Sequence, residues 1–254
     1  MRPAINSHSI QKEKHLRLLS ENGRVLCPMS DKIAEHYVKS GKYRPKNLGI
    51  KKATVFRGFC SYHDNDLFKL IEVDSLDYYD VDLHILFALR ATAYHLAFKK
   101  LQLHQTVRNH GLLRSENLES LNRVFAELLD EISIYSNILN TLYVASTSKS
   151  GKPILVTNVL ELNSQSPFAT TSPLNLQFDH KDRRINCWET LHTPLHPLFV
   201  SVFPDSGRTY IMIQYFQSDF SKFCLFVEYL ATLDHYYLGI QLSNLILSHS
   251  QNTF

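Results

Sequence analysis

The chain has 254 residues, of which 44% are hydrophobic and 20% are charged, and its formal net charge is +3. These values predict a globular protein with one large domain or two small ones. No apolar run approaches the roughly 20 residues needed to span a bilayer, so we expect no membrane-embedded segment. The N-terminus lacks an apolar signal segment, and the four cysteines lack the spacing of a disulfide framework. We therefore expect reduced thiols and a cytoplasmic location.

The hydrophobic period predicts an α+β fold whose sections change in character along the chain. A polar and basic segment, 1–75, is expected to form one domain and 76–254 a second one. Within the second domain, Pro204-Asp205-Ser206-Gly207-Arg208 predicts a tight β-hairpin, and alternation around 174–178 predicts another strand. The predicted sections are a long antiparallel helical hairpin over 80–145, a β-rich part over 153–216 and one buried helix over 219–248.

A basic run lies between residues 42 and 57, with Tyr43 and Phe56 interleaved among its cations. Two interpretations are open: a solvated loop, or a surface that neutralises the phosphates of DNA. The cations of this run are Lys42, Arg44, Lys46, Lys51, Lys52 and Arg57.

The chemically densest stretch is Phe59-Cys60-Ser61-Tyr62-His63-Asp64-Asn65-Asp66. Cys60-x-x-His63 has the spacing of half a structural zinc site, because two ligands on a tight knuckle can meet a second pair from elsewhere. The alternative is that Cys60 is a small core residue, since free cysteine is among the most buried residue types.

Ser7-His8-Ser9-Ile10, followed by the basic run and then by Cys60-x-x-His63-Asp64-Asn65, resembles the HNH endonuclease family and its treble-clef relatives. It also resembles uncharacterised bacterial proteins that carry such a knuckle. The resemblance covers about the first 75 residues. It implies a treble-clef-like segment with a ββα-metal unit, and a metal-dependent nuclease that serves in bacterial defence against foreign DNA.

The resemblance also assigns roles to individual residues. His8 becomes the general base that activates water, and Asp64 or Asn65 helps to hold a divalent cation such as Mg²⁺ at the leaving oxygen. Cys60 and His63 become the second pair of a structural zinc site. Because no cysteine precedes His8, the resemblance implies an N-terminally incomplete member with an incomplete zinc site.

Other candidate groups have simpler interpretations. His192 and His196 flank Pro194, which argues for a loop and not for a helical zinc-ligand pair. Asp179-His180-x-Asp182 fits a metal site or a polar turn, and His95 with His104 fits a solvated or packed helix face. The alternative to a nuclease is a non-catalytic module with a degenerate knuckle, whose apolar helices bind a protein partner or a second copy of the chain.

Overall fold

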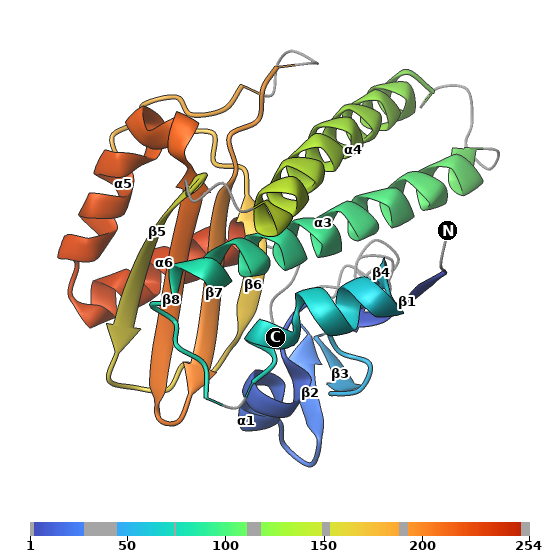
Figure 1. The fold of residues 1–254 in the computed structure, drawn as a ribbon. Coiled ribbons are helices and arrows are strands. Elements are labelled where there is room, and N and C mark those ends of the chain that lie inside the picture. The colour runs from blue at the N-terminus through green and yellow to red at the C-terminus, as the bar shows by residue number, and fades with distance from the viewer. Residues whose placement is uncertain are drawn as a thin grey trace.

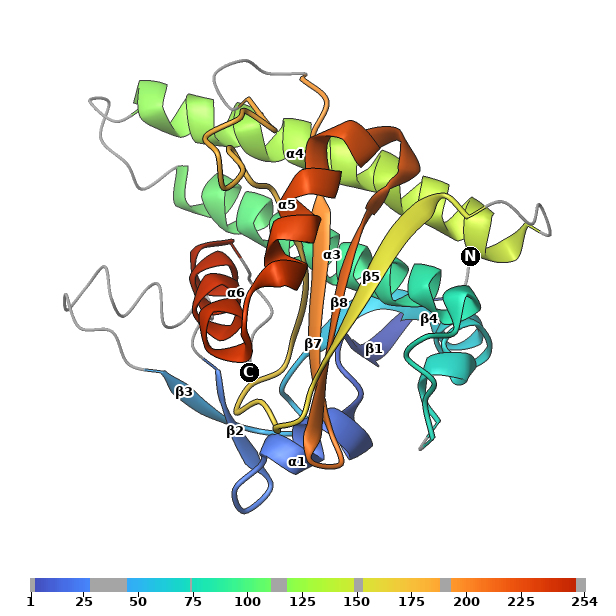
Figure 2. The same cartoon turned by 90° about the vertical axis from the view of Figure 1, so that its left-hand side faces the viewer.

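The fold is α+β and centres on a four-stranded antiparallel sheet of order β5-β8-β7-β6, which carries helices on both faces (Figures 1 and 2). Helices α3 and α4 cover one face, and α5 and α6 cover the other. The predicted fold class is confirmed. This computed structural model describes residues 3–27, 45–73, 75–110, 118–148, 153–187 and 193–249.

The strands and helices follow one another in a mixed order along the chain. The strands are β1 (Ala4–His8), β2 (Arg24–Cys27), β3 (Lys46–Gly49), β4 (Val55–Cys60), β5 (Leu155–Leu162), β6 (Thr170–Leu174), β7 (Leu198–Asp205) and β8 (Arg208–Phe216). The long helices are α3 (Val81–His110), α4 (Leu118–Thr147), α5 (Phe220–Thr232) and α6 (His235–His249). The short helical segments are η1 (Lys12–Leu16), α1 (Arg17–Leu19), η2 (His63–Leu67), η3 (Lys69–Ile71) and η5 (Gln217–Asp219).

Strands β7 and β8 form the predicted hairpin at the centre of the sheet. Ser206 and Gly207 make the turn with φ of 51° and 83°, and two left-handed residues are what a two-residue turn of this hand requires. Side chains alternate along both strands. Phe199 and Phe203 of β7 join the core beneath α3, whereas the alternate residues Leu198, Val200 and Val202 join the core beneath α5 and α6. Burial on both faces explains why β7 and β8 are almost continuously apolar.

Helices α3 and α4 form the predicted antiparallel hairpin and pack along each other. The Oδ1 atom of Asp80 accepts a hydrogen bond from the backbone N–H of Asp82 at 2.9 Å, which caps the start of α3 as expected. Among the described residues, no helix combines the length and the hydrophobicity needed to cross a bilayer.

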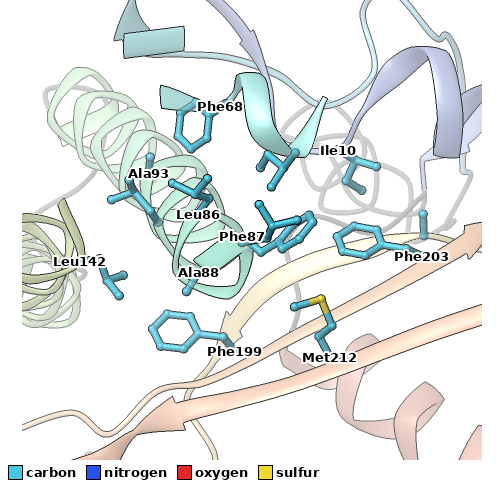
Figure 3. Close-up of a cluster of buried hydrophobic side chains, with 14 of the residues drawn as sticks. Ile10, Phe68, Leu86, Phe87, Ala88, Ala93, Leu142, Phe199, Phe203 and Met212 are labelled. Atoms are coloured by element: carbon cyan, nitrogen blue, oxygen red, sulfur yellow. The ribbon is translucent and has the colours of Figure 1, made fainter. Parts of the chain in front are cut away.

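Helix α3 is buried on almost all sides from Leu83 to Leu96. Figure 3 shows why: Ile10 and Phe68 of the N-terminal segment approach it from one side, Leu142 of α4 from another, and Phe199, Phe203 and Met212 of the sheet from below. A helix covered on several sides loses the polar stripe of a surface helix. One continuous hydrophobic cluster therefore joins the N-terminal segment, the helical hairpin and the sheet.

The N-terminal segment contains two small antiparallel sheets, β1 with β4 and β2 with β3. It is attached to the β7–β8 hairpin through η1. Lys14 Nζ lies 2.6 Å from Asp205 Oδ2, and His15 Nδ1 lies 3.0 Å from the carbonyl oxygen of Pro204. The ring of His15 also stacks on Phe203, with 4.7 Å between ring centroids. A partly buried ion pair and a buried histidine thus fix the segment to the sheet.

Acidification should destabilise the fold through His15. Burial lowers the pKa of His15 to about 4 from 6.5, so the unfolded chain binds this proton more readily than the folded chain. Neutral His15 therefore contributes a stabilisation that is complete above pH 6.5 and is lost as the pH falls to 4. The loss in the free energy of unfolding is about 3 kcal/mol. Urea unfolding at several pH values should show a flatter acid dependence for His15→Phe than for the parent. Equal slopes for the two proteins would contradict this assignment.

Two elements of the structure differ from those predicted from the sequence. The single helix expected over 219–248 is two helices, because Leu233 is extended and Asp234 starts a new helix, accepting the N–H of Tyr237 at 2.9 Å. The strand expected around 174–178 ends at Leu174. Beyond it, the chain leaves the sheet for a turn that the carboxylate of Asp179 closes.

Candidate functional site

His8 ends strand β1, and the loop before β4 holds its imidazole ring. Nδ1 lies 3.0 Å from both the carbonyl oxygen of Ala53 and Oγ1 of Thr54. A carbonyl oxygen only accepts, so we assign the proton to Nδ1, and Nε2 of the neutral ring becomes the acceptor. Within the described part of the chain, Nε2 has no hydrogen-bond partner. The half-buried ring therefore presents one free basic nitrogen.

Thr54 holds this ring from an unusual backbone conformation. Its φ is 59°, and a β-branched residue in the left-handed region is a genuine outlier that costs about 1–3 kcal/mol. Its Oγ1 also lies 3.5 Å from the carbonyl oxygen of Ile10, and its own carbonyl accepts the N–H of Ser9 at 3.0 Å. Thr54 is buried. The strained residue thus ties the His8 ring and the two residues after it to the loop, and the sequence gives no signal for this role.

Removing the Thr54 hydroxyl should loosen His8 without unfolding the protein. Thr54→Val keeps the shape and the strain but loses the hydrogen bonds, so we expect about 1–2 kcal/mol of destabilisation. Thr54→Gly relieves the strain and should be less destabilising. Proton NMR titration should then show the pKa of His8 moving towards 6.5 in both variants. An unchanged His8 titration in both would show that Thr54 does not position the ring.

The surroundings of His8 keep it neutral near pH 7. Burial is the largest effect and lowers its pKa, while the hydrogen bond to Ala53 raises it. The charges of Lys12 and Arg90 lower the pKa further, and that of Glu72 raises it. A neutral imidazole at physiological pH is the form that accepts a proton.

Arg90 of α3 is a second feature that sequence patterns do not indicate. Its side chain is buried, its Nη2 lies 2.8 Å from Oε1 of Glu72, and its guanidinium lies 4.3 Å from the ring centroid of Phe68. Its Nε is buried without a hydrogen-bond partner. Burial lowers the pKa of Arg90, and the carboxylates of Glu72 and Asp64 oppose that effect. The hairpin thus contributes a buried cation beside the N-terminal segment.

Cys60 and His63 lie together where β4 passes into η2. Cys60 Sγ is 3.4 Å from His63 Nδ1, and His63 Nε2 is 3.2 Å from the hydroxyl oxygen of Tyr143 on α4. The contact within the knuckle follows from the three-residue spacing. The contact to Tyr143, 80 residues further along the chain, depends on the docking of α4.

The knuckle has the spacing of a metal-ligand pair, but the described residues do not complete a zinc site around it. Ligands 2.3 and 2.1 Å from a tetrahedral zinc ion are about 3.6 Å apart, close to the separation of Cys60 Sγ and His63 Nδ1. Among the described residues, however, no group of three or more His, Cys, Asp or Glu side chains is arranged to hold a metal ion. Cys60 and His63 therefore fit half of such a site, and the described residues do not supply the other half.

His8 and the knuckle lie at opposite ends of the β1–β4 ladder. Ala4 pairs with Cys60, whereas His8 pairs with Val55. At about 3.3 Å per residue, the Cα atoms of His8 and Cys60 are roughly 13 Å or more apart. In the described part of the chain, no hydrogen bond joins His8 to the half-buried Asp64 or the exposed Asn65. The predicted residues thus form two groups.

The predicted basic residues are divided between two β-strands and a turn. Lys46 begins β3, Arg57 is an exposed residue of β4, and Lys51 and Lys52 are exposed in the turn that leads to Thr54. Lys42 and Arg44 lie outside the described residues. Two exposed lysines therefore precede the loop that holds His8.

The remaining candidates have structural roles. Asp179 closes a polar turn, and His180 stacks on Tyr229 with ring centroids 4.3 Å apart. His196 Nδ1 lies 2.8 Å from Asp219 Oδ1, whereas His192 lies outside the described residues. Two helix residues differ in environment: His95 is buried beside Glu131 of α4 at 3.0 Å, and His104 is exposed.

Comparisons with known proteins do not place this chain in a family. Models of protein families, curated proteins and solved structures were all compared with the chain, and none of them matches it.

Proposed function

We propose that this chain hydrolyses phosphodiester bonds in nucleic acid, with His8 as the general base. The observation that carries the proposal is the anchored His8 ring, whose Nδ1 is bound to Ala53 and the strained Thr54 while Nε2 has no partner in the described chain. Backbone strain of this kind is concentrated at functional sites. The segments β1, β4 and η2 also follow the strand, strand, helix order that the HNH resemblance implies, with η1, α1, β2 and β3 inserted between the two strands.

In the proposed reaction, Nε2 of His8 takes a proton from a water molecule. The water oxygen attacks phosphorus and the bond from phosphorus to the leaving oxygen breaks. The leaving oxygen takes a proton from solvent water, protonated His8 returns its proton to solvent, and the products are a phosphate monoester and a hydroxyl end. General-base assistance of this kind contributes about 10²–10⁴ in rate. The neutral state of His8 at pH 7 suits this role.

Charge near His8 suits a phosphate substrate. Lys12 is close enough to lower the pKa of His8, and the exposed Lys51 and Lys52 lie in the turn before Thr54. Cations attract the anionic backbone and offset the charge that develops in the transition state. We propose DNA as the nucleic acid on the resemblance of 1–75 to HNH endonucleases.

The resemblance also implies a divalent cation such as Mg²⁺ near Asp64 and Asn65. Such an ion would stabilise the leaving oxygen. Since the described residues do not form a complete ligand group, the proposed proton transfer is assigned to His8 alone. We propose a structural and not a catalytic role for zinc at Cys60 and His63.

The pH dependence of cleavage tests the proposal. The pKa of His8 lies below 6.5, so the rate should be constant above about pH 7 and should fall tenfold per pH unit once His8 is protonated. The assay uses purified protein on supercoiled plasmid DNA and on a labelled single-stranded oligonucleotide, with EDTA and with added Mg²⁺ or Mn²⁺. A rate that increases towards acid would argue against a histidine base.

A non-catalytic interaction module is the second candidate. It is favoured by exposed apolar side chains on the described helices, above all on α6. If folded protein cleaves neither plasmid DNA nor the oligonucleotide, with EDTA or with added metal ions, the interaction module is favoured over the nuclease.

A further inference from the structure

A cavity of about 560 Å³ opens where the helical hairpin, the sheet and the N-terminal segment meet. The start of α3, the end of α4, the start of β5 and the segments η2 and η3 line it, and we name it the α3–β5 cavity. Figure 2 shows α3, α4 and β5 converging on one side of the molecule. Sites for small molecules usually have volumes of roughly 300–1,000 Å³. The α3–β5 cavity is therefore large enough for a small molecule.

The floor and the sides of the α3–β5 cavity are apolar. Leu86 of α3 and Leu155 of β5 are buried and form its floor, and Ile85 is half-buried beside them. Apolar side chains continue to the mouth, where Leu70 and Val81 are 58% and 70% exposed. An apolar wall that runs from the core to the surface offers a place for the apolar part of a ligand.

Hydrogen-bond donors on the cavity wall are already used within the protein. Nε2 of His84 lies 2.9 Å from the carbonyl oxygen of Tyr78, which places the ring proton on Nε2. The hydroxyl of Ser146 donates to the carbonyl oxygen of Tyr143 at 2.8 Å. The residues that line the cavity include neither lysine nor arginine. These groups leave little for a ligand that accepts hydrogen bonds.

Gln214 places an unused acceptor directly behind the cavity floor. Its side chain is completely buried, and its Nε2 donates to the carbonyl oxygen of His84 at 2.9 Å and to Oγ1 of Thr157 at 3.2 Å. His84 and Thr157 both line the cavity. Oε1 of the same amide is buried and has no hydrogen-bond partner in the described chain. Because the amide joins α3 to β5, it also fixes the width of the cavity before any ligand binds.

Two carboxylates border the mouth of the cavity. Asp66 comes from η2 and Asp82 from the first turn of α3, and both are exposed. Among the described residues, neither carboxylate has a hydrogen-bond or ion-pair partner. The unused polar atoms around the cavity are thus acceptors, and two of the groups carry negative charge.

We propose that the α3–β5 cavity binds a small amphipathic amine. The apolar part of the amine lies against the floor, where it is removed from water. Its ammonium group lies at the mouth, where the carboxylates of Asp66 and Asp82 attract it and accept its hydrogen bonds. The inference does not rest on the proposed nuclease function, since neither His8 nor the residues that hold its ring line the cavity.

Three probes with one apolar group and different charges test the proposal: phenylbutylamine, phenylbutanol and phenylbutyrate. Each is titrated into the full chain at pH 7, and methyl NMR signals of Ile85 and Leu155 report binding. Leu129, an exposed residue of α4 outside the cavity, is the control signal. We expect a Kd on the order of 1 mM for the amine. The alcohol should bind about 3–10-fold more weakly, because it lacks the ion pairs, and the carboxylate more weakly still.

Two sets of variants separate the charge from the apolar cavity. Replacing both carboxylates, in Asp66→Asn/Asp82→Asn, should reduce the affinity for the amine to that for the alcohol and leave the alcohol unchanged. Ala145→Leu places a larger side chain on the cavity wall and should weaken binding of the amine and the alcohol at least about tenfold. Val144→Leu, at an exposed position of α4 that does not line the cavity, should bind like the parent. Circular dichroism verifies that each variant is folded.

Several outcomes would overturn the proposal. One is the absence of shifts at Ile85 and Leu155 with the amine at up to about 10 mM, which is well above the expected Kd. Another is equal affinity for the three probes, or an amine affinity that does not change in Asp66→Asn/Asp82→Asn. Undiminished binding by folded Ala145→Leu would place the binding site elsewhere.

Discussion

Replacing His8 with alanine should reduce the rate of phosphodiester cleavage by about 10²–10⁴, the contribution of a positioned general base. The half-buried ring lies at the end of β1, and its loss removes the hydrogen bonds to Ala53 and Thr54. Those bonds contribute only about 1–2 kcal/mol to the free energy of unfolding, so His8→Ala should remain folded in circular dichroism. Single-turnover cleavage of a labelled duplex measures the loss.

His63→Ala is the matched control for this result. His63 is also half-buried and hydrogen-bonded, but it belongs to the Cys60 knuckle at the other end of the β1–β4 ladder. We expect cleavage by His63→Ala to stay within about tenfold of the parent, since the base and its orientation remain. Cleavage that survives in His8→Ala would remove His8 from the reaction, and cleavage lost only in His63→Ala would move the site to the knuckle.

Replacing Asp205 with alanine should lower the free energy of unfolding by about 2–3 kcal/mol, because it removes charge-assisted hydrogen bonds from a partly buried ion pair. The side chains of Lys14 and Asp205 are 10% and 13% exposed, and the hydroxyl of Tyr78 donates to the same carboxylate oxygen at 2.9 Å. Burial alone would raise the pKa of Asp205, but hydrogen bonds from Lys14, Tyr78 and Ser206 outweigh it and hold the pKa below its usual value. Alanine would leave the ammonium and the phenol without their acceptor.

An exposed ion pair supplies the comparison. Arg123 and Glu127 are 3.0 Å apart on α4, with side chains 75% and 47% exposed. Glu127→Ala should therefore change the free energy of unfolding by no more than about 0.5 kcal/mol. Both variants are compared by urea unfolding at pH 7. Equal effects of Asp205→Ala and Glu127→Ala would show that the N-terminal segment is not held by the partly buried pair.

Elements governed by local patterns could be predicted from the sequence. The helical hairpin over 80–145 follows from apolar spacing and from the cap at Asp80, and the β7–β8 turn follows from Gly207. The break between α5 and α6 was missed, because the apolar spacing continues across Leu233 while the signal for the break is the single cap Asp234. Local hydrogen bonding outweighed the periodic pattern there.

The candidate site could be predicted only in part, because most of its contacts join distant segments. The three-residue spacing of Cys60 and His63 indicates their proximity, but nothing in the sequence indicates Tyr143 as a neighbour. The spacing of apolar residues in α3 predicts a helix that is buried along one stripe only, so the sequence does not predict that Arg90 is buried. Its burial depends on the N-terminal segment covering that helix. The left-handed Thr54 contradicts the preference of its residue type, so only the three-dimensional surroundings of His8 reveal it.

The sharing of α3 among three neighbours has a consequence for how the protein opens. Ile10 and Phe68 contact the same hydrophobic cluster as Leu142 and Phe199. Releasing the N-terminal segment would expose part of α3 to water, so partial opening there approaches the free energy of global unfolding. In native-state hydrogen exchange, the protected amides of β4 and β7 should therefore exchange through one common opening reaction, and proteases should find no stable intermediate between them.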